Sequence, residues 1–117
     1  MTRSPAAGSP QRLETLDTIA DGLAAPFAGT VTHAHCARFV DEWFLVTDAE
    51  IVAAMRVLLE RCKLVAEPAA AAAIVPLLTG VLQLQKGSMA VPIICGGNVD
   101  AGRLVSLFTQ FDKYEPA

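Results

Sequence analysis

Residues 89–100 read Met-Ala-Val-Pro-Ile-Ile-Cys-Gly-Gly-Asn-Val-Asp, an apolar run that passes through two glycines into polar residues. The apolar part, Met89 to Cys95, predicts a buried strand, although Pro92 removes one donor from its ladder. The glycine pair predicts a turn, and residues 100–111 predict a helix. Three apolar residues of this helix are expected to face inward: Leu104, Val105 and Phe108. A ligand site is expected where such a strand ends and the next helix begins.

The elements upstream follow the same alternation of strand and helix. The aromatic and β-branched run from Glu42 to Thr47 predicts a second strand. Asp48 begins the clearest helix, and Pro68 suits the first turn of another, which Pro76 should kink and Gly80 should end. The apolar face of the first of these helices is expected to comprise Ile51, Met55, Leu58, Leu59 and Cys62. The order of elements predicts an α/β architecture with parallel strands and crossover helices.

The chain is expected to divide into three parts. Residues 1–16, rich in Ser, Pro, Ala and Gly, predict a loop-like N-terminal segment, residues 17–112 the α/β domain, and residues 113–117 a C-terminal tail. Within the domain, Thr32 to Val40 predicts a short helix with Thr32 as its N-cap.

The composition indicates apolar faces that need a partner. Of the 117 residues, 53% are hydrophobic and 18% charged, and the mean hydropathy is +0.44. A small domain normally needs more polar cover, which favours packing against another part of a larger protein or another subunit. An alanine-rich α/β protein is the alternative reading, since alanine raises the apolar count without adding much bulk.

Charge and cysteine content narrow the setting. A net charge of −3 and a pI near 5.2 argue against nucleic acid or an anionic membrane as partner. The most apolar stretch, Ala69 to Leu82, is shorter than the ~20 residues that a membrane-spanning helix needs. Cys36, Cys62 and Cys95 form an odd set with no CxxC pair, which is typical of reduced thiols and a cytoplasmic location.

Three stretches carry a family resemblance by their order and spacing. They are Thr-Ile-Ala-Asp-Gly at 18–22, Glu-Arg-Cys-Lys-Leu-Val-Ala-Glu-Pro at 60–68 and Cys-Gly-Gly-Asn-Val-Asp at 95–100. Together they resemble the C-terminal part of the fold-type II pyridoxal-phosphate (PLP) enzymes, specifically the threonine/serine dehydratases and serine racemase. The resemblance covers roughly residues 13–108 and implies a partial domain of the tryptophan synthase beta-like fold.

The resemblance implies four cofactor-binding residues. Cys95 takes the position of a Ser or Cys that faces the pyridine nitrogen of PLP, with Gly96 beside it. Gly22 matches a glycine whose backbone nears the ring, and Glu67 matches a glutamate close to the ring. Without the resemblance, Gly96 reads as part of a tight turn, Glu67 as a helix-start acid beside Pro68, and Gly22 as a turn glycine.

Two hallmarks of the family do not occur in this sequence. The resemblance implies a cofactor-holding lysine in a Ser-Phe-Lys-x-Arg-Gly-type motif and a glycine run for the phosphate, and neither is present. No catalytic residue is therefore assigned, and Lys63 matches a family position outside that motif. No metal ligand is assigned either, since His33, His35 and Cys36 lack the spacing and the fourth ligand of a structural zinc site.

Two functions remain open on the sequence. The first is the C-terminal segment of a PLP-dependent lyase that deaminates L-threonine or L-serine to a 2-oxo acid and ammonia, inactive as this chain alone. Such an enzyme would need the missing N-terminal half or another subunit, and would be a homo-oligomer when complete. The alternative is a non-catalytic α/β module or degenerate remnant that acts through association with another chain. Dehydratase and racemase are not distinguished by these residues.

Overall fold

The computed structural model describes residues 4–112, so the expected tail at 113–117 lies outside the described part of the chain. The chain divides between Leu45 and Val46 into two compact units. Each unit is described by itself below.

The first unit contains two α-helices and a short 3-10 turn. These are α1 (Ser4–Ala7), η1 (Asp21–Leu23) and α2 (Thr30–Phe39). The buried Ser4 of α1 contacts α2 through its carbonyl, which lies 3.2 Å from Nε2 of His33, and its hydroxyl accepts the N–H of Gln11 in the following loop at 3.0 Å. The segment expected to be loop-like thus includes one helical turn.

The α2 helix begins earlier than the sequence predicts. Its N-cap is Gly29, in an extended conformation, and the first helical bond runs from His33 N to Gly29 O at 2.8 Å. The expected cap at Thr32 is therefore wrong, because Thr32 already lies inside the first turn. Gly29 needs no side-chain oxygen to hold the cap conformation, and glycine is among the residues accepted at this position.

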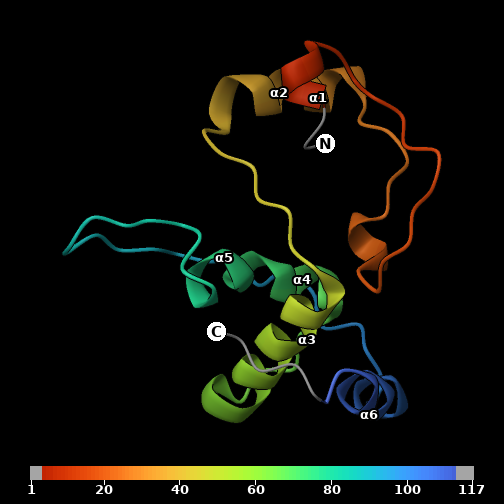
Figure 1. Ribbon diagram of the computed structural model, residues 1–117, viewed down its shortest axis with the longest axis vertical. Helices are drawn as coiled ribbons and strands as arrows, with labels where there is room; N and C mark the ends of the chain where they lie inside the picture. Colours follow the sequence, from red (N-terminus) through yellow and green to blue (C-terminus); the bar gives the residue numbers. More distant parts are fainter. Residues whose placement is uncertain (1–3, 113–117) are drawn as a thin grey trace. The chain divides into compact units, whose positions relative to one another are not determined.

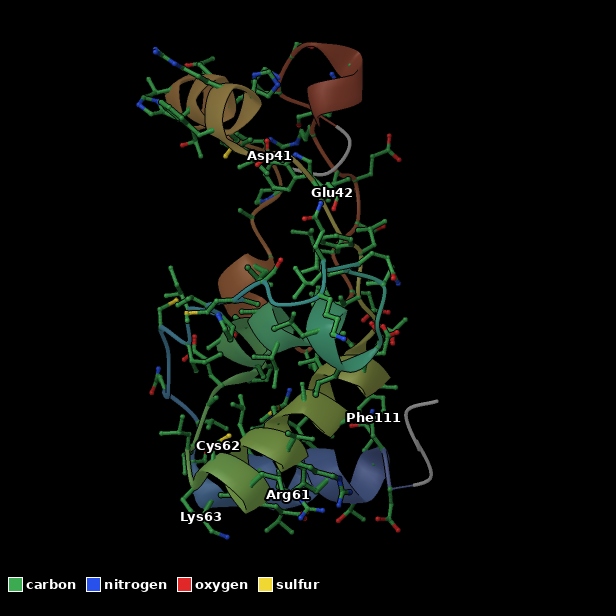
Figure 2. The ribbon with its side chains drawn as sticks, turned by 90° about the vertical axis from the view of Figure 1, so that its left-hand side faces the viewer. Asp41, Glu42, Arg61, Cys62, Lys63 and Phe111 are labelled. Atoms are coloured by element: carbon green, nitrogen blue, oxygen red, sulfur yellow. The ribbon has the colours of Figure 1, made fainter. Side chains whose placement is uncertain are left out.

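The second unit is built around α3 (Asp48–Val57), which begins where the sequence predicts, whereas Cys62, expected on its apolar face, is exposed. Thr47 caps it: Glu50 N donates to Thr47 Oγ1 at 3.3 Å, and Thr47 N donates to Glu50 Oε2 at 2.6 Å. The helix continues as one π turn, η2 (Leu58–Cys62), and ends at Lys63, whose φ of 59° is left-handed. Figure 2 shows Arg61, Cys62 and Lys63 gathered at this end of the helix.

Proline breaks the next helix as expected. The run after Glu67 divides into α4 (Pro68–Ala71), the 3-10 turn η3 (Ala72–Ile74) and α5 (Val75–Leu78), in which Pro76 lies at the start. Because proline lacks the N–H that a continuous helix would use, the chain restarts there. These pieces pack against α3, and α6 (Ala101–Gln110) lies along another side of it (Figure 1).

The core of the second unit lies between α3 and these neighbours. Its largest fully buried side chains are Ile51, Val52, Met55, Val75 and Leu107. The inward face expected for α6 is partly wrong, because Leu107 is 0% exposed whereas Val105 is 66% exposed. Leu104, Leu107 and Phe108 share one face at spacings of three and four, and Val105 falls outside that face.

Neither predicted strand forms a strand in the described residues, whose pairing is limited to one isolated antiparallel bridge between Arg12 and Phe27. Both segments expected to be strands, 42–47 and 89–95, run without a ladder. The parallel sheet is thus not seen here. The backbone N–H and C=O groups of a strand pair with those of a neighbouring strand, and an extended segment without such a neighbour forms no ladder.

Segment 89–95 exposes large apolar side chains. Met89, Val91 and Ile93 are 88%, 77% and 75% exposed, and Ala90 and Pro92 between them are exposed as well. Among residues 4–112, no helix has the length and apolar character to traverse a lipid bilayer.

Candidate functional site

Glu67 and the loop that follows segment 89–95 meet through both backbone and side chain. Glu67 N donates to Gly96 O at 3.1 Å, and the Glu67 carboxylate accepts the N–H of Asn98 through Oε2 at 2.9 Å. Glu67 is also the N-cap of α4 by backbone position, but its side chain makes no capping bond to that helix. The side chain instead turns to residues 96–98, so Glu67 both begins α4 and contacts the loop that follows segment 89–95.

Gly96 lies directly against this carboxylate. A Cβ atom at position 96 would stand 2.5 Å from both Cδ and Oε1 of Glu67. A Cβ at Gly97 would stand 3.1 Å from the carbonyl oxygen of Val65. The glycine pair thus lies in close approach to residues 65–67: the neighbour of Gly96 is the flexible end of the Glu67 side chain, and that of Gly97 is the Val65 carbonyl.

Cys95 stands beside this junction with an exposed, free thiol. Five residues after Cys95, Asp100 caps α6 by accepting the N–H of Arg103 at 2.8 Å. The short passage from Cys95 to α6 is thus held at two points, by the Glu67 carboxylate and by the Asp100 cap. The resulting site, which we call the Glu67 junction, comprises Glu67, Cys95, Gly96, Gly97 and Asn98.

The structure brings three of the four expected cofactor residues together in the Glu67 junction. The fourth, Gly22, belongs to the first unit, where it lies in the η1 turn and its N–H donates to the side chain of its neighbour Asp21 at 2.8 Å. The Asn98 N–H was not among the expected contacts. The only sequence signal for this contact was the place of Asn98 in the Cys-Gly-Gly-Asn stretch. A backbone N–H is present in nearly every residue type, so the residue type does not reveal that it donates.

Three other side chains that could take part in catalysis or metal binding instead form hydrogen bonds with the backbone. His33 and His35 face backbone carbonyls, of Ser4 and Val31, at 3.2 and 3.0 Å. The described part of the chain has no group of three or more metal-ligating side chains. Lys63 donates to the carbonyl of Glu60 at 2.8 Å.

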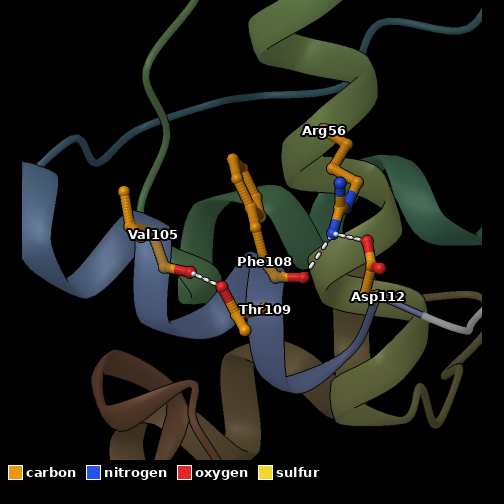
Figure 3. A pocket seen from close by; sticks show the side chains of 5 residues that line it. All are labelled: Arg56, Val105, Phe108, Thr109 and Asp112. Atoms are coloured by element: carbon orange, nitrogen blue, oxygen red, sulfur yellow. Dashed lines mark hydrogen bonds and ion pairs between the residues drawn. The ribbon is translucent and has the colours of Figure 1, made fainter.

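A pocket of 280 Å³ beside α6 is a feature separate from the Glu67 junction. It is lined by Arg56, Val105, Phe108, Thr109 and Asp112 (Figure 3). The Arg56 guanidinium lies 4.8 Å from the centre of the Phe108 ring, donates to the Phe108 carbonyl and pairs with Asp112 at 3.3 Å. These contacts anchor α6 to α3 and leave the guanidinium already engaged.

The family model of the pyridoxal-phosphate dependent enzymes matches residues 1–96. The chain belongs to this family, whose cofactor is pyridoxal phosphate. The fold expected from the resemblance is thereby supported at the level of the family, fold-type II.

Named relatives fall among the dehydratases and racemases of this family. The chain is 38% identical to a phenylserine dehydratase of Ralstonia pickettii over 101 aligned residues, and the alignment covers 86% of this chain and 31% of the relative. It is 40% identical over 98 residues to the catabolic L-threonine dehydratase of Escherichia coli K12, covering 83% and 30%. The structure of maize serine racemase superposes with a TM-score of 0.77 at 34% identity, covering 93% and 35%. The chain thus spans about a third of the length of these relatives.

The Glu67 junction offers one end of the cofactor a free thiol, at Cys95, while the Glu67 carboxylate occupies the space over Gly96. The phosphate end has no match, because the sequence lacks the glycine run that would supply clustered backbone N–H groups. The Glu67 junction therefore fits the ring end of PLP alone.

Proposed function

We propose that this chain supplies the residues that border the pyridine ring of the cofactor in a PLP-dependent ammonia-lyase that deaminates L-threonine or L-serine. One observation carries the proposal: Glu67 and Gly96, 29 positions apart by their numbers, are joined by a backbone hydrogen bond beside the free thiol of Cys95. The dehydratase names of the relatives support this substrate class. The overall reaction yields a 2-oxo acid and ammonia, with the water lost at the β-carbon returned in hydrolysis.

PLP would supply the electron sink for removal of the α-proton, and this chain would tune it. In the proposal the neutral thiol of Cys95 is the partner of the ring nitrogen. A thiol is a weak hydrogen-bonding group and would not hold a proton on that nitrogen, so the ring would be a moderate electron sink. Moderate electron withdrawal suits β-elimination better than transamination. Glu67 and Gly96 would border the ring in this proposal.

The rest of the enzyme would come from sequence that this chain does not contain. We propose that segments 42–47 and 89–95 join a parallel sheet there, linked by crossover helices in a domain of residues 17–112. The exposed apolar side chains of Met89, Val91 and Ile93 support this, since a neighbouring layer would cover them. The partner is an N-terminal half or another subunit, and the complete enzyme is a homo-oligomer. The free cysteines support a cytoplasmic setting in amino-acid metabolism.

A non-catalytic module is the second candidate function. It is favoured by the absence from the sequence of the cofactor-holding lysine motif. A module of this kind would unfold cooperatively as an isolated chain and would not need a partner to fold. The enzyme segment, with its exposed apolar strand pattern, is expected to gain stability from a partner.

The proposal is tested by a chimera with a relative. This chain would replace the matched 98 residues of the Escherichia coli L-threonine dehydratase, and 2-oxo acid production would be measured with L-threonine and L-serine. We expect product from the chimera and none from the isolated chain with added PLP. Product from the isolated chain would show that the activity does not need a partner. A folded chimera that neither binds PLP nor forms product would favour the non-catalytic module.

A further inference from the structure

The Glu67 carboxylate occupies the space that a side chain at position 96 would take. Its Oε1 and Cδ lie 2.5 Å from the ideal Cβ position of Gly96, and its Cγ lies 3.0 Å away. The second oxygen, Oε2, accepts the Asn98 N–H at 2.9 Å. One carboxylate therefore fills the space over residue 96 and binds the backbone of residue 98.

We propose that Glu67 is a positioning residue that brackets the Cys95–Asn98 loop, and that Gly96 is glycine to admit this bracket. The inference deepens the proposed function, on which its catalytic consequence rests, by giving Glu67 a role through the loop and Cys95. The bracket itself is a property of this chain without cofactor.

The bracket works through two bonds at one place. The backbone bond from Glu67 N to Gly96 O fixes the end of segment 89–95 beside the start of α4. The charge-assisted bond to Asn98 N then sets the direction in which the chain leaves that segment toward α6. Val99 N donates to Gly97 O at 2.9 Å and keeps the intervening turn tight. The backbone that follows Cys95 is thus held at residues 96 and 98.

The isosteric variant Glu67→Gln distinguishes the positioning role of Glu67 from a requirement for its negative charge. Glu67→Gln keeps an oxygen that can accept the Asn98 N–H, whereas Glu67→Ala removes it. Gly96→Ala would push the carboxylate aside and break the same bond from the other partner. If the bracket is real, Gly96→Ala has little further effect once the Glu67 side chain is gone.

The test follows the Asn98 amide of the full chain by NMR hydrogen exchange without PLP. We expect Glu67→Ala to speed exchange of this amide roughly tenfold, the effect of losing one charge-assisted bond, and Glu67→Gln to restore most of the protection. Gly96→Ala should speed it similarly in the native background and add little to Glu67→Ala. Glu60→Ala, on an exposed turn of the same unit, is the matched control and should leave it unchanged.

Two results would overturn the bracket. One is unchanged Asn98 exchange in Glu67→Ala, and the other is an equal effect of Gly96→Ala with and without the Glu67 side chain. In the chimera, Glu67→Ala should weaken PLP binding and Glu67→Gln should recover it. If Glu67→Ala speeds Asn98 exchange but leaves PLP binding unchanged, the bracket stands and its catalytic consequence is removed. Failure of the bracket and failure of the proposed function are thus distinguishable.

Discussion

Replacing Leu107 by alanine is expected to lower the free energy of unfolding of the full chain by about 2–5 kcal/mol, the range for a large-to-small change in a packed core. Leu107 is 0% exposed and is the fully buried side chain of α6. The contact between α6 and α3 depends on it, because the rest of the α6 face is only half-buried. Urea denaturation followed by circular dichroism measures the loss.

Val105→Ala is the matched control on the same helix. Val105 is 66% exposed, and a surface change of this kind is expected to stay within about 0.5 kcal/mol. Equal losses for the two variants would contradict the assignment of Leu107 as the buried side chain, and would restore the face that periodicity predicted.

Replacing Gly96 by valine is expected to have the second large effect, a loss of about 1–3 kcal/mol, because it displaces the Glu67 carboxylate and breaks its charge-assisted bond to Asn98. The new Cβ would stand 2.5 Å from two atoms of the Glu67 carboxyl group, so this flexible side chain must swing away. Both the bond to Asn98 and the approach of the two segments would suffer.

Gly29→Ala provides the comparison for Gly96→Val in the same denaturation experiment. A Cβ at position 29 would meet only Thr32 Oγ1 at 3.6 Å, an ordinary contact distance, and Gly29 has a negative φ. Its replacement is expected to cost only about 0.5 kcal/mol, the penalty of alanine at an N-cap, with no contribution from a clash. A Gly96→Val chain as stable as the native one would show that residues 65–67 do not press against the glycine pair.

The sequence predicted the elements that depend on local signals. Thr47 and Glu50 supply both halves of a capping box, so α3 begins where expected, and Pro76 restarts its helix because the missing N–H is a local property. The α6 helix likewise begins at its Asp100 cap. The start of α2 was predicted two residues late, because a glycine N-cap leaves a weaker signal than threonine.

The strands could not be predicted in the same way, because a ladder depends on a neighbour that residue type does not reveal. Segment 89–95 has the pattern of a strand, but nothing within it indicates whether its partner is present. The site shows the same division. The family motifs led to Cys95, Glu67 and Gly96, whereas the reason for Gly96, the carboxylate of a residue distant in sequence, needed the three-dimensional arrangement.

The central claim is that Cys95 borders the ring of PLP, and the most direct measurement is the absorption spectrum and PLP affinity of the active chimera carrying Cys95→Ala. The account predicts a shifted cofactor absorption band or weaker PLP binding, because the partner of the ring nitrogen is lost. Cys62→Ala, which removes another exposed free thiol of the same unit, should leave both unchanged. A Cys95→Ala chimera with unaltered absorption and affinity would contradict the account and remove Cys95 from the site.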